Sequence, residues 1–149
     1  MKKITFFLLI LAPFFAVCQN NSDPVYYTLP DFGKAGAYSH AVEANDMLYI
    51  SGTIPLDYTT GAPDTADIAK ATTRVLNNLK TIAEYCGADF KNAVKVNVYM
   101  RNMGDFFKMN EVYKTFFSEN YPIRTTVGVT ALPLNVPIEM DMVISKNKK

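Results

Sequence analysis

The sequence is poor in the residues that usually bind metal ions or form catalytic nucleophile–base pairs. Its 149 residues include one histidine, two cysteines and no tryptophan. Zinc sites are built mainly from several Cys and His ligands, so we expect no metal site. His40 is the only candidate base for a catalytic triad, and its strand-like surroundings favour a structural role. The segment 33–36 lacks the spacing and the strand-to-helix setting of a phosphate loop.

An excess of charge of one sign is also missing. Lys and Arg total 15, Asp and Glu total 14, and the formal net charge is +1. The chain has no Lys/Arg cluster of the kind that follows a phosphate backbone, so we expect no nucleic-acid partner. Apolar residues make up 49% of the chain and charged residues 19%, which is typical of one globular domain.

The N-terminus has the pattern of a secretory signal peptide. Lys2 and Lys3 precede the apolar run Ile4–Val17, and the small residues at 16 and 18 suit cleavage before Gln19. The run is too short to span a bilayer comfortably. We therefore predict a signal peptide over residues 1–18 and an exported protein, periplasmic or secreted, with no membrane contact after cleavage. Lipidation of Cys18 and a buried N-terminal helix are the alternatives.

Cleavage would change both the charge and the thiol content. Without Lys2 and Lys3, 13 Lys and Arg remain against 14 Asp and Glu, a net charge of −1. Cys86 would be the only thiol, so no intramolecular disulfide could form. Its position before Gly87, at the end of a helical pattern, favours a small buried residue over a nucleophile. Residues 19–25 are polar and predict a linker, followed by a single domain over 26–149.

Apolar periodicity predicts an α+β domain. Spacing of three and four residues indicates helices, and alternation indicates strands. Asn45-Asp46 is a plausible hairpin turn, Thr65 or Asp67 a helix cap, and Gly87 a helix end. The expected elements are a hairpin around 42–55, a helix over 68–86, a strand over 94–100, a helix over 105–119, and strands over 124–132 and 137–145.

The last two strands each have a more apolar face, which we expect to pack against the helices. In 137–145 this face carries Ile138, Met140, Met142 and Ile144. In 124–132 it would carry Thr125, Val127, Val129 and Ala131. The second face would then hold both Arg124 and Glu139, and it faces water or another copy of the chain. Two sheets closed together would place a small-molecule site at a subunit interface.

Arg124 and Glu139 are the candidate functional pair. A guanidinium offers a planar set of donors that matches the two oxygens of a carboxylate. The residues alone leave two interpretations open. Arg124 either binds the carboxylate of a ligand or pairs with Glu139, Asp141 or an acid of another chain.

Four segments resemble the RidA (reactive-intermediate deaminase) family in order and spacing, and together they cover roughly residues 26–145. The last of them is the most specific. The segments are Gly36-Ala37-Tyr38-Ser39-His40-Ala41-Val42, Tyr49-Ile50-Ser51-Gly52-Thr53-Ile54-Pro55-Leu56-Asp57, Phe107-Lys108-Met109-Asn110-Glu111-Val112-Tyr113, and Pro122-Ile123-Arg124-Thr125-Thr126-Val127 with Leu132-Pro133 and Ile138-Glu139-Met140.

The resemblance implies a chorismate-mutase-like mixed sheet with two helices on one face, a homotrimer, and ligand clefts between subunits. It implies that Arg124 binds the substrate carboxylate and Glu139 orients the reacting water, with no metal and no cofactor. The substrate-binding positions that it implies are Tyr38, Ser51, Gly52, Asn110 and Thr126. The family often has proline, glutamine and cysteine where this chain has Ala37, Thr53 and Thr126, which bears on substrate preference.

These residues are expected to hydrolyse small 2-imino acids, 2-iminobutanoate or 2-iminopropanoate, to 2-oxo acids and ammonia. The expected partners are that small carboxylic acid and further copies of the chain. Predicted export supports an alternative, a non-catalytic binder of small carboxylates on the same fold. Ribonuclease activity, attached to some family members, is less favoured because the mature chain is slightly acidic and has no basic-aromatic track.

Overall fold

The computed structural model describes residues 23–34, 36–117 and 120–146. Its strands form one six-stranded sheet in the order β1-β2-β3-β6-β4-β5, in which only β4 and β5 run parallel. The elements in chain order are β1 Val25–Tyr27, β2 Ala41–Ala44, β3 Met47–Thr53, α1 Ile68–Tyr85, η1 Phe90–Asn92, β4 Ala93–Met100, η2 Met103–Asp105, α2 Phe106–Phe116, β5 Ile123–Gly128, η3 Pro133–Asn135 and β6 Ile138–Ser145.

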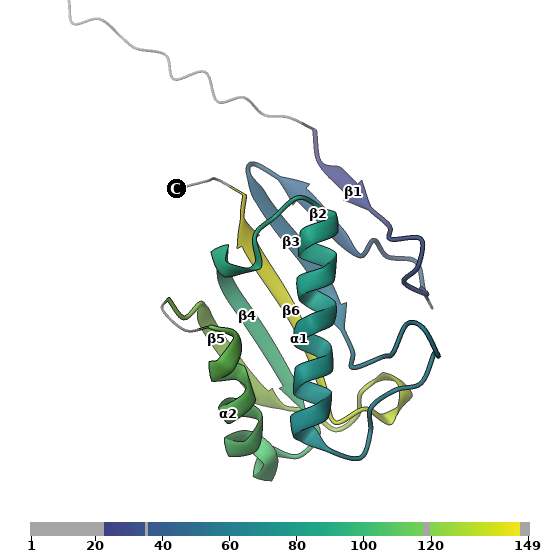
Figure 1. The fold of residues 1–149 in the computed structure, drawn as a ribbon, viewed down its shortest axis with the longest axis vertical. Helices are drawn as coiled ribbons and strands as arrows, with labels where there is room; N and C mark the ends of the chain where they lie inside the picture. The colour runs from purple at the N-terminus through teal and green to yellow at the C-terminus, as the bar shows by residue number, and fades with distance from the viewer. Residues whose placement is uncertain (1–22, 35, 118–119, 147–149) are drawn as a thin grey trace, which may run out of the picture.

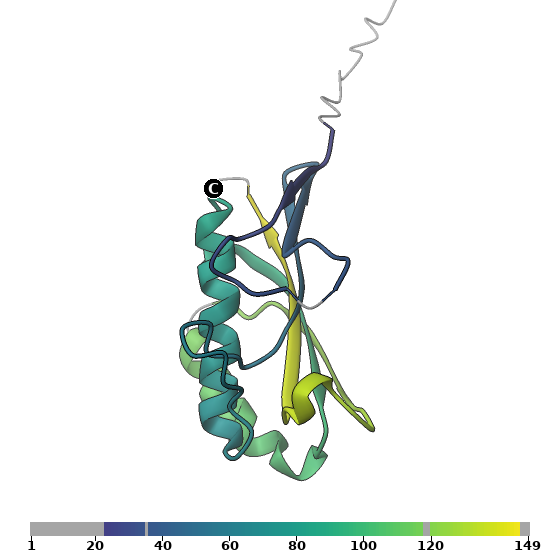
Figure 2. The same cartoon turned by 90° about the vertical axis from the view of Figure 1, so that its right-hand side faces the viewer.

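Both α-helices lie on the same face of the sheet (Figures 1 and 2). α1 crosses the central strands, and α2 lies toward the edge formed by β5. The predicted mixed sheet with two helices on one face is therefore confirmed. The predicted signal peptide, 1–18, lies outside the described residues, as do positions 19–22 of the predicted linker. β1 begins at Val25, the last residue assigned to that linker.

The predicted hairpin turn joins β2 to β3. Asn45 and Asp46 have φ values of 50° and 59°, as a type I′ turn requires at both central positions. Asn and Asp tolerate this left-handed backbone better than other non-glycine residues. Ala44 pairs with Met47, so the turn has two residues and sets the register of the strands.

α1 has the predicted cap, apolar stripe and end. The Asp67 carboxylate accepts a hydrogen bond from the Lys70 backbone N–H at 2.9 Å, which satisfies one free donor of the first turn. The chain leaves the helix through Gly87, whose φ of 70° is the left-handed conformation that glycine favours. Cys86 is buried, and its burial raises the pKa of the thiol to about 11, so the predicted inert cysteine is confirmed.

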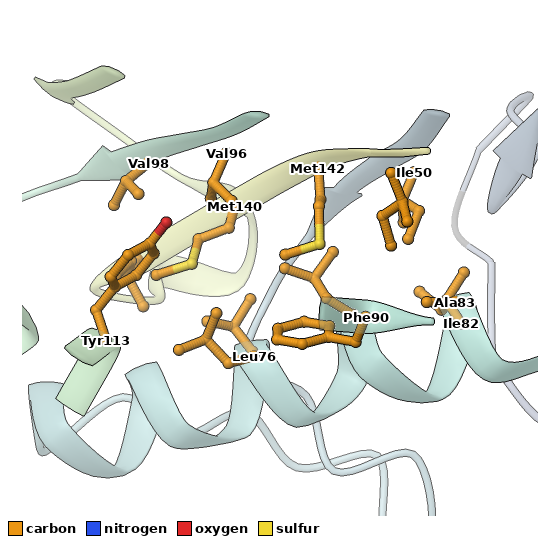
Figure 3. Close-up of a cluster of buried hydrophobic side chains, with 14 of the residues drawn as sticks. Ile50, Leu76, Ile82, Ala83, Phe90, Val96, Val98, Tyr113, Met140 and Met142 are labelled. Carbon is orange, nitrogen blue, oxygen red and sulfur yellow. The ribbon is translucent and has the colours of Figure 1, made fainter. Parts of the chain in front are cut away.

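The core lies between the helices and the sheet (Figure 3). β6 contributes Met140 and Met142, and β4 contributes Val96 and Val98, all fully or almost fully buried. The strict alternation predicted for β4 fails at Val94, which is 40% exposed because the register with β6 shifts between Ala93 and Lys95.

α2 is shorter than predicted, since it ends at Phe116, and Ser118 and Glu119 lie outside the described residues. Met109, Tyr113 and Phe117 are buried against the sheet and α1.

The predicted face assignment for β5 is wrong. Arg124 and Thr126 pair with Val96 and Val98, whose side chains face the helices, and Arg124 contacts α2. Val127 is instead 40% exposed on the opposite side. β5 is an edge strand, and an arginine can lay its methylene stem along apolar groups, so polarity did not indicate the buried face here.

Replacing Gly87 with Ala should destabilise the protein by about 1 kcal/mol, because a Cβ disfavours the left-handed backbone. Nothing lies within 4 Å of a Cβ at this position, so the effect would come from the backbone alone. Denaturant unfolding measures it. Gly33→Ala is the matched control, since Gly33 has equal free space and no left-handed φ. Equal stability of the two variants would contradict the assignment of Gly87.

Candidate functional site

The seven predicted site residues form two groups within one protomer. Around Arg124 lies a cavity of about 350 Å³, here called the arginine pocket. It is lined by Asn110, Tyr113, Lys114, Tyr121, Pro122 and Arg124. Around Glu139 lies a larger cavity of about 620 Å³, here called the glutamate cavity. It is lined by Gly33, Gly36, Tyr38, Ser51, Gly52, Ile54, Leu56, Tyr58, Pro133, Leu134 and Glu139.

The Arg124 guanidinium is held by one face of α2. Its Nη2 donates to Asn110 Oδ1 at 3.0 Å. Its Cζ lies 4.6 Å from the ring centroid of Tyr113 and 5.6 Å from that of Phe106. These contacts position the cation without neutralising it, because amides and aromatic rings carry no net charge. Among the described residues no carboxylate pairs with Arg124, which does not support the ion-pair interpretation with Glu139 or Asp141.

Three α2 residues form this support because of their spacing. Phe106, Asn110 and Tyr113 are four and three residues apart, so they share one side of the helix. Apolar spacing predicts that Phe106 and Tyr113 lie on the inner face of this helix, but it does not reveal their contact with Arg124. An amide within an otherwise apolar stripe was the signal that pointed to a polar group opposite α2.

Two hydroxyl groups near this site are buried without a hydrogen-bond partner among the described residues. They belong to Tyr113 on α2 and Thr126 on β5. Figure 3 shows the Tyr113 hydroxyl directed toward the sheet beside Val98. Burial raises the pKa of Tyr113 to about 12, so it stays protonated. The Thr126 side chain faces the helices, as that of its register partner Val98 does, and its hydroxyl is enclosed there.

Glu139 occupies the opposite face of the sheet from Arg124. It pairs with Tyr99 in the sheet register, where Tyr99 alternates with the buried Val98 and Met100. Burial raises the pKa of the Glu139 carboxyl, and the neighbouring Asp141 carboxylate raises it further. A raised pKa makes the Glu139 carboxylate a stronger base than an ordinary glutamate.

Gly52 makes room for the Glu139 side chain. The register between β3 and β6 shifts between Ile50 and Thr53, which places Ser51 and Gly52 in a bulge. A Cβ on Gly52 would overlap Glu139 Oε1 and lie 3.2 Å from its Cδ. Any residue with a Cβ at position 52 would displace the Glu139 carboxylate from its observed position.

Asp141 is fixed beside Glu139 by two neighbouring residues of β4. Its carboxylate accepts from Asn97 Nδ2 at 2.8 Å and from the Tyr99 hydroxyl at 2.9 Å. These two hydrogen bonds hold the Asp141 carboxylate near Glu139, where its negative charge raises the pKa of Glu139.

The loop that carries Tyr38 is tied to the sheet by its neighbours. Ser51 Oγ donates to the Ser39 carbonyl at 2.6 Å. The backbone N–H of Leu29 donates to His40 Nδ1 at 3.0 Å. His40 is buried, and burial lowers the pKa of its imidazole. The nearby Lys34 charge lowers this pKa further. The Nδ1 contact supports the predicted structural role of His40, while its Nε2 is buried with no hydrogen-bond partner among the described residues. The His40 ring meets the Tyr38 ring edge to face, with 5.9 Å between the centroids.

Across the described ranges, no group of three or more His, Cys, Asp or Glu side chains is arranged to hold a metal ion. In the same part of the chain, no helix combines the length and the apolarity needed to cross a bilayer.

Comparison with known proteins identifies the family. A family model described as "Endoribonuclease L-PSP" matches residues 30–145. The human 2-iminobutanoate/2-iminopropanoate deaminase is 37% identical over 111 residues, which cover 74% of this chain and 81% of that protein. The chain therefore belongs to the Endoribonuclease L-PSP family, and the resemblance to RidA proteins seen in the sequence is confirmed.

Solved structures support the same fold. The crystal structure of yeast Mmf1 has a TM-score of 0.77 and 32% identity, over 84% of this chain and all (100%) of that chain. The structure of E. coli TdcF with bound serine has a TM-score of 0.73 and 31% identity, over 77% and 92% of the two chains.

Tyr113→Phe should leave stability unchanged or raise it by up to about 1 kcal/mol, because it removes a buried hydroxyl that has no described partner. Tyr99→Phe is the matched control and should cost about 1 kcal/mol, since its hydroxyl donates to Asp141. Thermal unfolding of the two variants gives the comparison. A larger loss for Tyr113→Phe than for Tyr99→Phe would show that the Tyr113 hydroxyl has a partner.

Proposed function

We propose that the protein hydrolyses the C=N bond of small 2-imino acids, such as 2-iminobutanoate and 2-iminopropanoate, to 2-oxo acids and ammonia. The observation that carries this proposal is the Arg124 guanidinium, held in an open pocket by neutral groups rather than by a carboxylate. Such a cation is available to a ligand's carboxylate. The names of the human relative and of serine-bound E. coli TdcF support a small ligand of this class.

A complete site would need two copies of the chain. Arg124 and Glu139 project from opposite faces of one sheet, so a single small ligand cannot contact both within one protomer. In the proposed homotrimer, the arginine pocket of one subunit meets the glutamate cavity of the next. Asn110 would then come from the first subunit, and Tyr38, Ser51, Gly52 and Glu139 from the second. The enclosed Thr126 hydroxyl, which does not line the arginine pocket, would support Arg124 from within the first subunit.

The proposed reaction begins with the substrate carboxylate on Arg124. Glu139 orients a water molecule and accepts one of its protons as the water oxygen bonds to the C=N carbon. The nitrogen takes up a proton, and the resulting carbinolamine releases ammonia as its hydroxyl loses a proton and becomes the carbonyl. Tyr38 and the Gly52 backbone would border the reacting carbon, and Ser51 would hold the Tyr38 loop.

The predicted signal peptide makes export part of the proposal, and it also favours the second candidate function. Imino acids form where pyridoxal-phosphate enzymes act, in the cytoplasm, and an exported protein would meet fewer of them. A non-catalytic binder would keep Arg124 and bind 2-oxobutanoate without releasing ammonia. An ammonia assay on freshly generated 2-iminobutanoate separates the two functions.

Arg124→Ala and Glu139→Gln should each lower kcat/KM for 2-iminobutanoate. Loss of the bidentate contact to Arg124 is worth about 2–4 kcal/mol, or roughly 30- to 1000-fold. When equal amounts of the two variants are unfolded and refolded together, activity should return. Random assembly gives about one quarter of the sites both an intact Arg124 and an intact Glu139 from different chains.

Each variant refolded alone is the control for this experiment. A site formed within one chain would regain nothing on mixing, since every chain carries one defect. Near-normal turnover by Arg124→Ala, with the oligomer preserved, would refute the assignment of Arg124.

The pH dependence of kcat/KM should show an acidic limb governed by Glu139. Activity falls as Glu139 becomes protonated, and because its pKa is raised, the limb should lie above the ordinary range of a glutamate. Asp141→Asn removes the smaller cause of this shift, so the midpoint should move to lower pH while burial keeps it raised. The asparagine can still accept from Asn97.

The uncatalysed hydrolysis of the imine also depends on pH, so its rate must be subtracted at every pH. If the acidic limb has the same midpoint in the wild type and in Asp141→Asn, then Asp141 does not influence the group that governs this limb. A limb that persists in Glu139→Gln would assign it to another group.

A further inference from the structure

The glutamate cavity extends well past Glu139 along an apolar wall. Ile54, Leu56, Tyr58, Pro133 and Leu134 line this part of the cavity. The cavity volume of about 620 Å³ lies in the range of roughly 300–1,000 Å³ that is usual for drug-sized ligands. A side chain of one or two carbons, as in 2-iminopropanoate or 2-iminobutanoate, leaves most of that wall without a contact.

The wall is built on anchored backbone. Asn78 of α1 donates from Nδ2 to the carbonyl oxygens of Ile54 and Leu56, at 3.1 and 2.9 Å. The Tyr58 ring stacks on Phe32, with 3.8 Å between the ring centroids. Burial raises the pKa of Tyr58 to about 12. The hydrogen bonds from Asn78 and the stacking on Phe32 fix this surface before any ligand binds.

Leu134 is the residue that the fold explains least. Its φ is 50°, a left-handed conformation that is unfavourable for a residue with a Cβ. Its side chain is nevertheless 60% exposed, so burial in the protomer does not offset this cost. Glycine or asparagine would fit this backbone with less strain. A leucine here is explained if its side chain contacts something apolar in the cavity.

The electrostatics restrict what that apolar group can be. Of the described residues that line the cavity, Glu139 alone carries a charge, and the polar atoms near the wall are the hydroxyls of Tyr38, Tyr58 and Ser51. An anionic group would be repelled here and would belong on Arg124. The group that contacts this wall is therefore uncharged. It would be bonded to the reacting carbon of the substrate, which the proposed function places beside Glu139.

We infer that this wall is a specificity subsite for the side chain of the substrate, and that the preferred substrates are 2-imino acids with branched aliphatic or aromatic side chains. The inference rests on the proposed function, because it places the reacting carbon at Glu139. Leu134 and Tyr58 are the specificity-determining residues. Each additional buried methylene contributes about 0.8 kcal/mol to binding, close to fourfold in affinity.

The test compares kcat/KM for imino acids generated freshly from leucine, phenylalanine and 2-aminobutanoate by an amino-acid oxidase. The wild type should prefer the two larger substrates over 2-iminobutanoate by about tenfold or more. Leu134→Asn should lower that ratio at least about fivefold, while the apolar Leu134→Met should keep it. Both variants occupy the same backbone position, and Asn suits it better, so unfolding cannot account for a loss in Leu134→Asn alone.

A binding measurement keeps the inference separate from the catalytic proposal. Calorimetric titration with phenylpyruvate and with 2-oxobutanoate reports on the subsite without turnover. Tighter binding of phenylpyruvate, reduced in Leu134→Asn, supports the subsite even if ammonia release is absent and the proposed activity fails. Equal preference for small and large ligands overturns it, whether or not the protein is active. A preference for small ligands also overturns it, and would indicate that a neighbouring subunit fills the wall.

Discussion

The structure depends on how α2 holds Arg124. A guanidinium at the edge of a core needs hydrogen bonds and a polarisable surface, and Asn110, Tyr113 and Phe106 supply both without adding a negative charge. The cation stays positive and directed, which is the condition for recognising a carboxylate. This contact also explains why β5 turns Arg124 toward the helices, and it separates Arg124 from Glu139 within one protomer.

The two halves of the site follow different physical rules. Around Arg124, aromatic rings and an amide hold the guanidinium in place. Around Glu139, burial and the neighbouring Asp141 raise the pKa of a carboxyl group. The bulge at Gly52 is what allows the second arrangement, because the carboxylate occupies the space that a side chain would take. In the proposed reaction, binding and proton transfer would belong to separate elements, which the proposed assembly would bring together.

Most of the fold could be predicted from the sequence because local rules determine it. The turn at Asn45 and Asp46, the cap at Asp67 and the apolar stripe of α1 each rely on neighbouring residues. The orientation of β5 could not, because polarity misleads when an arginine lies on aromatic rings at a sheet edge. The site residues were selected by motif, whereas the support from Tyr113 and the unusual backbone of Leu134 depend on tertiary contacts.

The buried thiol of Cys86 has a consequence for where such a fold can work. With a pKa near 11, the thiol supplies very little thiolate at neutral pH, and it is enclosed at the end of α1. Glutathione and other small oxidised thiols would form a mixed disulfide with it only slowly. The domain should therefore keep the same covalent structure in a reducing or an oxidising compartment. Moving it between compartments during evolution would require a new N-terminal targeting sequence but no change in the core.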